Sequence, residues 1–391
     1  MAARPDIARL YEWLVDGAPG AAGAAEVVQR LGDELVAAGV RVARLAAFVR
    51  TLHPSVMGRR FVWQRGVPEV EVRAAPHAIL STAEYIESPV YVVTATGREF
   101  RCRLDVDTPF DYEILEQQRR AGFTDYLCLP MPFLAGEVHA IGYTTDAPGG
   151  FTDEELAALR TVTRPLSRLA EILALRRTAG ALLSAYVGRD AGERILRGQI
   201  LRGDTESIRC VIWFSDLRGF TSMSSTAQPP EIIVVLNRLF ECQVPAVERH
   251  GGEVLKFMGD GMLAIFPVDD ARPAAAVCTA ALAATTDAFA ALDGLNAERA
   301  AAGAPPLAFG VSLHLGEVAY GNIGSETRLD FTCIGPAVNL ASRIEGLTGK
   351  LGKRVLVSDA FARASPAPLR PVGTFELKGV AGAATVHEPL H

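Results

Sequence analysis

Two aspartates in the second half of the chain stand at positions typical of a metal-dependent reaction. Asp216 follows a short apolar run in the segment 214–221 (FSDLRGFT), and Asp260 lies in a Gly-Asp-Gly turn. A carboxylate at the end of a buried strand can bind a divalent cation. The backbone amides of the turn after it, around Phe220 and Thr221, can hold phosphate oxygens of a substrate.

Each aspartate also has an ordinary explanation when it is taken singly. A helix N-cap explains Asp216, and hairpin-turn chemistry explains Asp260. Taken together, two carboxylates on neighbouring strand ends can hold two Mg²⁺ ions about 4 Å apart, the arrangement used in phosphoryl and nucleotidyl transfer.

Three further polar residues in this half have chemistry suited to a nucleotide. Lys256, four residues before Asp260, can donate to a ring nitrogen or a phosphate, or it is a solvated edge lysine whose stem packs on apolar surface. Asn339 and Arg343 stand at i and i+4 and share one helix face, which suits a ribose and a phosphate. A plain solvated helix face is the alternative.

The elements that must position these residues alternate along the second half. An apolar run at 210–214 predicts a central strand buried on both faces. Other predicted elements follow it: strands at 254–257, 263–266, 307–315 and 355–358, and helices that begin at Pro229 and at Ala337. Alternating strands and helices predict a layered α/β sandwich over residues 208–391.

The first region, residues 1–175, has the pattern of an α+β domain with an antiparallel sheet. Apolar residues at helical spacing between 27 and 36 precede a β-branched run at 40–49. The segments 126–133 and 138–143 predict a hairpin. Thr152 then caps a helix, with Glu155 in the capping-box position.

The helix after Thr152 carries a heptad pattern. Its apolar residues step by 3, 4, 3 and 4 positions: Leu159, Val162, Leu166, Leu169 and Leu173. Two interpretations stay open, a helix that faces its own core and a helix that pairs with a second copy. Pro165 predicts a kink or a helix start. The pattern ends at Arg176, and residues 176–207 are predicted to be a helical or linker segment that carries a signal.

Composition excludes several classes of protein. The chain has 391 residues and a net charge of −6, so it has no bulk attraction for nucleic acid. The most apolar segment, 274–286, is too short to span a membrane, and no signal sequence opens the chain, so we expect a cytoplasmic protein. Mean hydropathy is nevertheless positive, +0.19, which indicates apolar surface buried between chains or an effect of alanine. The scattered cysteines predict reduced, buried thiols: Cys102, Cys128, Cys210, Cys242, Cys278 and Cys333.

The motifs of the second half, taken in order, resemble those of one family. The segment 214–221 resembles the first metal motif of class III nucleotidyl cyclases, and 255–261 (LKFMGDG) looks like their second metal motif with its base-recognising lysine. The segments 331–335 (FTCIG) and 338–345 (VNLASRIE) look like their base-recognising and transition-state motifs. The segment 377–380 (LKGV) resembles their late phosphate-binding motif.

The likeness covers about residues 208–388 and implies a ferredoxin-like α/β sandwich domain. It also implies that Asp216 and Asp260 hold two divalent metal ions, Mg²⁺ or Mn²⁺, in each active site. Such ions bind the triphosphate of the substrate and activate its ribose 3′-hydroxyl.

The resemblance implies roles for the remaining polar residues. Lys256 and Thr332 would recognise the adenine edge, Asn339 would orient the ribose, and Arg343 would stabilise charge around the α-phosphate. Lys378, which by itself is an ordinary surface lysine, would bind the β- and γ-phosphates. Because Lys256 donates and adenine N1 accepts, ATP is the expected substrate, and the expected product is cyclic AMP.

The resemblance also implies an assembly. Family members form each active site between two catalytic domains, and this chain has one such domain with the complete residue set, so a head-to-tail homodimer is expected. Pro336 departs from the Asp or Asn common in the family at that place. The first region looks like a GAF-type sensor for a small-molecule or protein signal.

Two other functions remain as alternatives. A guanylate cyclase is disfavoured by Lys256 and Thr332. A non-catalytic nucleotide-binding module should have lost at least one of the motif residues, and none is lost here.

Overall fold

A computed structural model describes residues 5–51, 56–106, 111–225, 227–380 and 382–390, with the side chain of Thr221 outside the description. The chain folds into two compact units, Met1–Leu182 and Leu183–His391. Both are mixed α and β structures, as the sequence predicts.

The first unit is built on a six-stranded antiparallel sheet of order β3-β2-β1-β6-β5-β4. Its strands are β1 Arg44–Arg50, β2 Gly58–Gln64, β3 Glu71–Ala75, β4 Phe100–Arg103, β5 Asp125–Pro132 and β6 Val138–Thr145. Strands β5 and β6 form the predicted hairpin.

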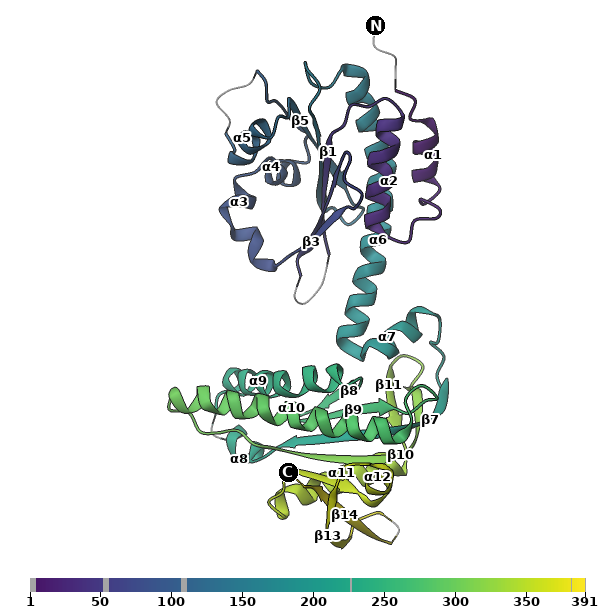
Figure 1. Cartoon of the computed structure of the whole chain (residues 1–391), viewed down its shortest axis with the longest axis vertical. Helices are drawn as coiled ribbons and strands as arrows, with labels where there is room; N and C mark the ends of the chain where they lie inside the picture. The colour runs from purple at the N-terminus through teal and green to yellow at the C-terminus, as the bar shows by residue number, and fades with distance from the viewer. Residues whose placement is uncertain (1–4, 52–55, 107–110, 226, 381, 391) are drawn as a thin grey trace. The chain divides into compact units, whose positions relative to one another are not determined.

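Helices cover both faces of this sheet (Figure 1). One face carries α1 Ala8–Val15, α2 Ala24–Ala37 and α6 Asp153–Val187, and the largest apolar cluster of the unit lies beneath them. The other face carries the 3₁₀ helix His77–Ser81, α3 Ala83–Ile86, α4 Pro89–Thr96 and α5 Glu113–Arg120. The N-terminus of α6 has the predicted capping box, since the Thr152 amide donates to Glu155 at 2.8 Å and the Glu155 amide donates to Thr152 Oγ1 at 3.2 Å.

The heptad pattern on α6 faces the core of its own unit. Leu159, Val162, Leu166 and Leu169 are buried in the cluster beneath α1 and α2, and Leu173 packs against the same cluster. Of the two interpretations, the helix that faces its own core is confirmed, and pairing of this stripe with a second copy is wrong, because the apolar stripe is already covered. Pro165 lies inside the helix without ending it.

The helix also extends beyond Arg176, where its apolar pattern ends, as far as Val187. Residues 176–207 thus contain the end of α6, α7 Arg189–Leu196 and the first residues of β7.

The second unit is built on an eight-stranded mixed sheet of order β13-β14-β12-β10-β7-β9-β8, with β11 paired to β10. Its strands are β7 Thr205–Leu217, β8 Glu253–Met258, β9 Gly261–Pro267, β10 Phe309–Gly324, β11 Leu329–Ile334, β12 Val355–Ser358, β13 Leu369–Glu376 and β14 Ala383–Pro389. Strand β7 is central and buried on both faces, as predicted: Val211 and Trp213 pack in one cluster, and Cys210 and Ile212 pack in another.

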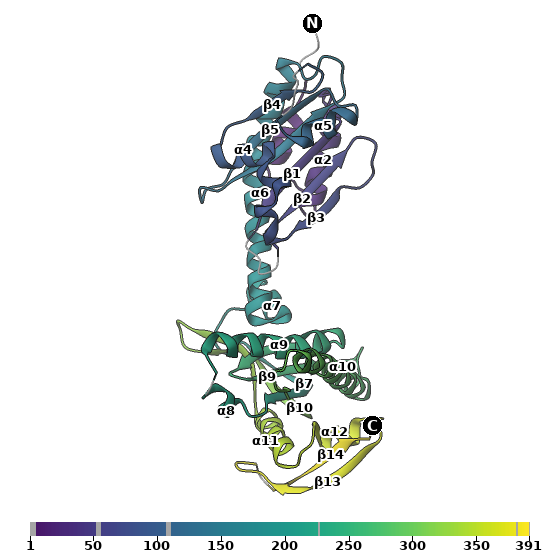
Figure 2. The same cartoon turned by 90° about the vertical axis from the view of Figure 1, so that its left-hand side faces the viewer.

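Two layers of helix enclose this sheet (Figure 2). The long helices α9 Pro229–Arg249 and α10 Ala274–Ala301 pack on one face, and α11 Pro336–Lys350 packs on the other. Two short helices complete the unit, α8 Phe220–Ser224 and α12 Asp359–Ala364. All six cysteines are buried and free, as expected.

Helix α10 is longer than the apolar segment at 274–286 indicates. Among the described residues it is the one helix long and apolar enough to cross a membrane by length and composition. Val277, Ala281, Ala288 and Leu292 on this helix are buried in the core of the second unit. A buried core helix can have the same length and apolar composition as a membrane span, so the length and composition of α10 are weak evidence for a span.

Candidate active site

The two predicted metal ligands lie together at one end of strands β7 and β9. Asp216 is on β7, directly opposite Gly261 of β9, and Asp260 occupies the turn just before Gly261. Burial, followed by the charge of Asp260, raises the pKa of Asp216 to about 6. Like charges held side by side in a partly buried place favour either a proton or a cation between them.

Glycine is required in this turn for close approach of the two strands. A Cβ atom on Gly261 would lie 2.9 Å from the Ser215 carbonyl oxygen and 3.3 Å from Asp216 Oδ1. Gly259 has a φ of 66°, a left-handed conformation that favours glycine. The Gly-Asp-Gly sequence therefore holds Asp260 against the end of β7.

The residues after Asp216 begin helix α8. Gly219 precedes it with a φ of 74°, and the Phe220 side chain packs against the apolar cluster shared by α9 and α10. Only the backbone of Phe220 is thus available to a phosphate. The side chain of Thr221, the other predicted substrate contact in this turn, lies outside the described residues.

The two predicted base-recognising residues lie on strands β8 and β11, which are not paired in the sheet. Lys256 Nζ is 2.7 Å from Asp330 Oδ2, and Thr332 lies two residues after Asp330 on the same side of β11. Thr332 is 4% exposed, and its Oγ1 has no hydrogen-bond partner within the described residues. A buried hydroxyl without a partner is costly in a finished core and is typical of a ligand site.

Asp330 was missed by the sequence reasoning. Its position could have indicated it, because Asp330 is two residues before Thr332 in a strand and alternate residues of a strand share a face.

Asn339 and Arg343 lie on the exposed face of α11. Both are exposed, and neither has a hydrogen-bond or ion-pair partner in the part of the chain that the structure describes. The opposite face of α11 is buried through Ala341 and Ile344. Pro336 occupies the first turn of this helix, where the missing amide costs nothing.

Lys378 is exposed in the segment between β13 and β14. Within one chain, the residues predicted for ribose and phosphate binding are therefore not joined to the aspartates by any described hydrogen bond or ion pair.

The carboxyl pair fits a divalent cation. Asp216 and Asp260 supply the hard oxygen ligands that Mg²⁺ and Mn²⁺ prefer, and their mutual repulsion would be relieved by a cation. In the described residues, no three acidic, histidine or cysteine side chains are grouped closely enough to hold one metal ion. The chain thus offers two ligands, and a substrate phosphate or water would complete the shell.

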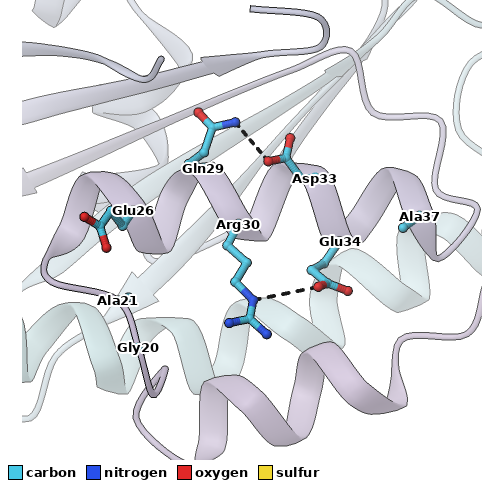
Figure 3. A pocket seen from close by; sticks show the side chains of 8 residues that line it. All are labelled: Gly20, Ala21, Glu26, Gln29, Arg30, Asp33, Glu34 and Ala37. Atoms are coloured by element: carbon cyan, nitrogen blue, oxygen red, sulfur yellow. Dashed lines mark hydrogen bonds and ion pairs between the residues drawn. The ribbon is translucent and has the colours of Figure 1, made fainter. Parts of the chain in front are cut away.

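The described residues of the first unit form hollows of moderate size. One, of about 520 Å³, lies along α2 and the loop before it (Figure 3). Its polar side chains are engaged with each other: Gln29 donates to Asp33 at 2.9 Å, and Arg30 lies 3.7 Å from Glu34. Another, of about 360 Å³, lies between β5 and α6 and is lined by Arg160, Arg164 and Arg168 among others.

Comparison with known proteins places the second unit in a family. Residues 204–387 match the family described as "Adenylate and Guanylate cyclase catalytic domain". An adenylate cyclase of Anabaena cylindrica is 38% identical over 165 residues, which are 41% of this chain and 32% of that protein. Adenylate cyclase 1 of Rhizobium meliloti is 32% identical over 179 residues, 45% of this chain and 26% of that protein.

Among solved structures, the guanylyl cyclase Cya2 is 31% identical, with 47% of this chain and 93% of that chain covered and a TM-score of 0.42. The chain spans about a third or less of the length of the two curated relatives above. Residues 204–387 belong to the class III adenylate and guanylate cyclase catalytic domain family.

Proposed function

We propose that this chain is an adenylate cyclase that converts ATP to 3′,5′-cyclic AMP and pyrophosphate. The observation that carries the proposal is the carboxyl pair of Asp216 and Asp260, held together at the end of the central strands of a cyclase domain. The named relatives with the highest identities above are adenylate cyclases, which favours ATP over GTP.

The proposed reaction is an in-line displacement at the α-phosphorus. The ribose 3′-oxygen forms a bond to this phosphorus, the bond to the β-phosphate oxygen breaks, and pyrophosphate leaves. Two divalent ions held by Asp216 and Asp260 would lower the pKa of the 3′-hydroxyl and neutralise phosphate charge. The proton leaves to Asp216 or to solvent. Arg343 stabilises the charge that develops around the α-phosphate, and Lys378 holds the β- and γ-phosphates.

Base choice depends on Lys256 and Thr332. The Lys256 ammonium is held by Asp330 and can turn to donate to adenine N1, and the partner-free hydroxyl of Thr332 is available to the exocyclic amine. Guanine presents an N1–H at the same place, so two donors would face each other and the site would reject it.

The active unit is proposed to be a head-to-tail homodimer with two equivalent sites. Asn339 and Arg343 are exposed and have no hydrogen-bond or ion-pair partner among the described residues, which supports a site that a second copy completes. Large apolar side chains beside the base-recognising strands are exposed, which is typical of a surface that a partner covers: Phe257, Met258, Leu329 and Ile334.

The first region is proposed to be a GAF-like sensor that regulates the cyclase in the cytoplasm. The proposed sensor is residues 1–175, the proposed signalling segment is 176–207, and the proposed catalytic domain is 208–391. A continuous helix, α6, leads out of the first unit, so a ligand-induced change there has a rigid element to act on. A thermal-shift screen of small molecules on the full chain would find the signal.

The test is a cyclase assay on the purified chain with ATP or GTP and either Mn²⁺ or Mg²⁺. We expect cyclic AMP and pyrophosphate in equal amounts, and no product from Asp216→Asn. An absence of product with both metals and both nucleotides, in a folded dimer, would contradict the proposal. Cyclic GMP as the main product would establish the guanylate alternative.

A mixing experiment tests the shared site. Asp216→Asn and Arg343→Ala should each be inactive alone. Mixed and allowed to exchange subunits, they should recover about a quarter of wild-type activity, because half of the dimers are mixed and one site in each mixed dimer is intact. A mixture as inactive as its components would contradict the head-to-tail arrangement.

A further inference from the structure

A third carboxylate, Glu345, lies beside the aspartate pair on a different element. It is on α11, and its Oε1 accepts a hydrogen bond from Thr348 Oγ1 at 3.2 Å. A Cβ atom on Gly310 of β10 would lie 3.0 Å from the same Oε1. The Thr348 hydroxyl lies closer still to that Cβ position, so the hydrogen-bonded pair of Thr348 and Glu345 occupies the space that a side chain at position 310 would fill.

That space is next to Asp216. Gly310 stands directly opposite Asp216 in the antiparallel register of β10 and β7, and directly opposite residues project to the same face, with Cβ atoms about 5 Å apart. On its other side Asp216 is opposite Gly261, whose Cβ position is 3.3 Å from Asp216 Oδ1. Both residues opposite Asp216 are thus glycines, and a carboxylate oxygen lies within 3.3 Å of each Cβ position, Glu345 Oε1 at Gly310 and Asp216 Oδ1 at Gly261.

The electrostatic environment of Glu345 agrees with this placement. Burial, and after it the charge of Asp216, raises the pKa of Glu345 to about 7, with a smaller contribution from Asp260. The positive charge of Arg218 acts to lower the pKa of Glu345. The Nε atom of Arg218 is itself buried and has no hydrogen-bond partner among the described residues. The Glu345 carboxylate therefore has no direct ion-pair partner there, although three acidic groups gather at the place where a cation is proposed to bind.

We propose that Glu345 is a positioning residue that raises the affinity of the Asp216–Asp260 pair for its divalent cation. Glu345 would act indirectly, through its negative charge and through a water molecule bound to the cation. It would not be a direct ligand, since the three carboxylates are not grouped closely enough to ligate one ion together. The inference rests on the proposed function, because it deepens the same metal site.

One helix would then serve both sites of the proposed dimer. Glu345 is six residues after Asn339 and two after Arg343, which places it about 120–160° away from them around the helix axis. Glu345 faces the aspartates of its own chain, while Asn339 and Arg343 face outward to the site completed by a second copy.

The test measures metal binding without turnover. The full chain is saturated with 3′-deoxy-ATP, which lacks the attacking hydroxyl, and titrated with Mn²⁺ while free Mn²⁺ is followed by electron paramagnetic resonance. Glu345→Gln keeps the size of the side chain and the hydrogen bond from Thr348 but removes the charge. We expect its affinity for Mn²⁺ to fall about tenfold, since one charge near a divalent ion is lost.

The controls separate this inference from the proposed function. Glu248→Gln removes an exposed charge on α9 and should bind Mn²⁺ as the wild type does. Asp216→Asn should lose more affinity than Glu345→Gln. If Asp216→Asn weakens binding and Glu345→Gln does not, the inference is wrong and the metal site stands. If neither weakens binding, the metal site itself is wrong.

Thermal melting in a chelator distinguishes a purely structural role. Glu345→Gln should melt at or above the wild-type temperature, because a repelled carboxylate is removed. Should it melt lower, Glu345→Asp keeps the charge on a shorter stem and should bind Mn²⁺ more tightly than Glu345→Gln. Equal affinities of these two variants would overturn the inference.

Discussion

Buried carboxylates have opposite electrostatic environments in the two units. In the first unit, Glu155 accepts hydrogen bonds from the Arg41 side chain at 2.7 and 2.9 Å, and the fully buried Asp125 is 2.7 Å from Arg101. Burial raises the pKa of Glu155, but the hydrogen bonds from Arg41 more than offset it and leave the pKa lowered.

In the second unit, Asp216 and Glu345 have raised pKa values because burial and neighbouring carboxylates act together. A carboxylate with a cationic partner holds a fold together, whereas carboxylates that repel each other cost stability and are kept for a ligand. The contrast separates structural charges from functional ones.

The largest effect expected from this comparison is on activity. Asp216→Asn removes one of two metal ligands while it relieves repulsion, so we expect cyclase activity to fall at least about 10³-fold with no loss of thermal stability. Product formation and thermal melting in a chelator measure the two effects. Substantial remaining activity would mean that Asp216 is not a metal ligand.

The matched change in the first unit should do the reverse. Asp125→Ala leaves Arg101 without its partner and the Phe151 amide without its acceptor. We expect the free energy of unfolding of the first unit to fall by about 3 kcal/mol, because one partner of a buried pair is lost. Denaturant titration checks this, and an unchanged midpoint would mean that the pair is not structural.

The next largest effect is on stability, at the heptad residues of α6 that lie in the core of the first unit. Leu166 is buried in the core cluster of the first unit, so Leu166→Ala should destabilise this unit by about 3 kcal/mol through the cavity it leaves. Because its stripe is covered by its own unit, we expect the oligomeric state of the folded variant to match the wild type. Sedimentation measures that state, and dissociation without loss of stability would restore the dimer-helix interpretation.

A smaller effect is expected at the base-recognising lysine. Lys256→Ala removes the proposed donor to adenine and frees Asp330, so kcat/KM for ATP should fall about 10- to 100-fold. Steady-state kinetics with ATP and GTP measure the change. An equal fall for both nucleotides would assign Lys256 to phosphate binding instead.

The smallest effect is shared by both units. Burial, aided by Arg50, lowers the pKa of His139 to about 4, and burial lowers that of His314 to about 4. Both are neutral when folded and protonate more readily when unfolded, so their contribution is complete above about pH 6.5 and is lost as the pH falls toward 4.

Each histidine should cost on the order of 1 kcal/mol at pH 5.5. Denaturant titrations at pH 7 and pH 5.5 measure the difference. His139→Gln should flatten this dependence in the first unit, and His314→Gln should flatten it in the second. An unchanged slope in both variants would contradict the assignment of neutral, buried rings.

Much of the fold follows from local patterns. The apolar run before Asp216, the capping box at Thr152 and the hairpin of β5 and β6 lie where the sequence predicts them, because each depends on neighbours within a few residues. The site residues were found in the same way, from short motifs in a fixed order. Whether they work as proposed depends on contacts that a motif does not contain.

Other features needed the tertiary structure. The sequence determined that one stripe of α6 is apolar, but only packing decided that its own unit covers the stripe, because periodicity identifies a face and not its partner. Likewise, the sequence determined that residues 339–345 form a helix rich in polar side chains. The register of β10 against β7 decided that Glu345 lies beside Gly310, the residue opposite Asp216, because that arrangement joins residues distant along the chain.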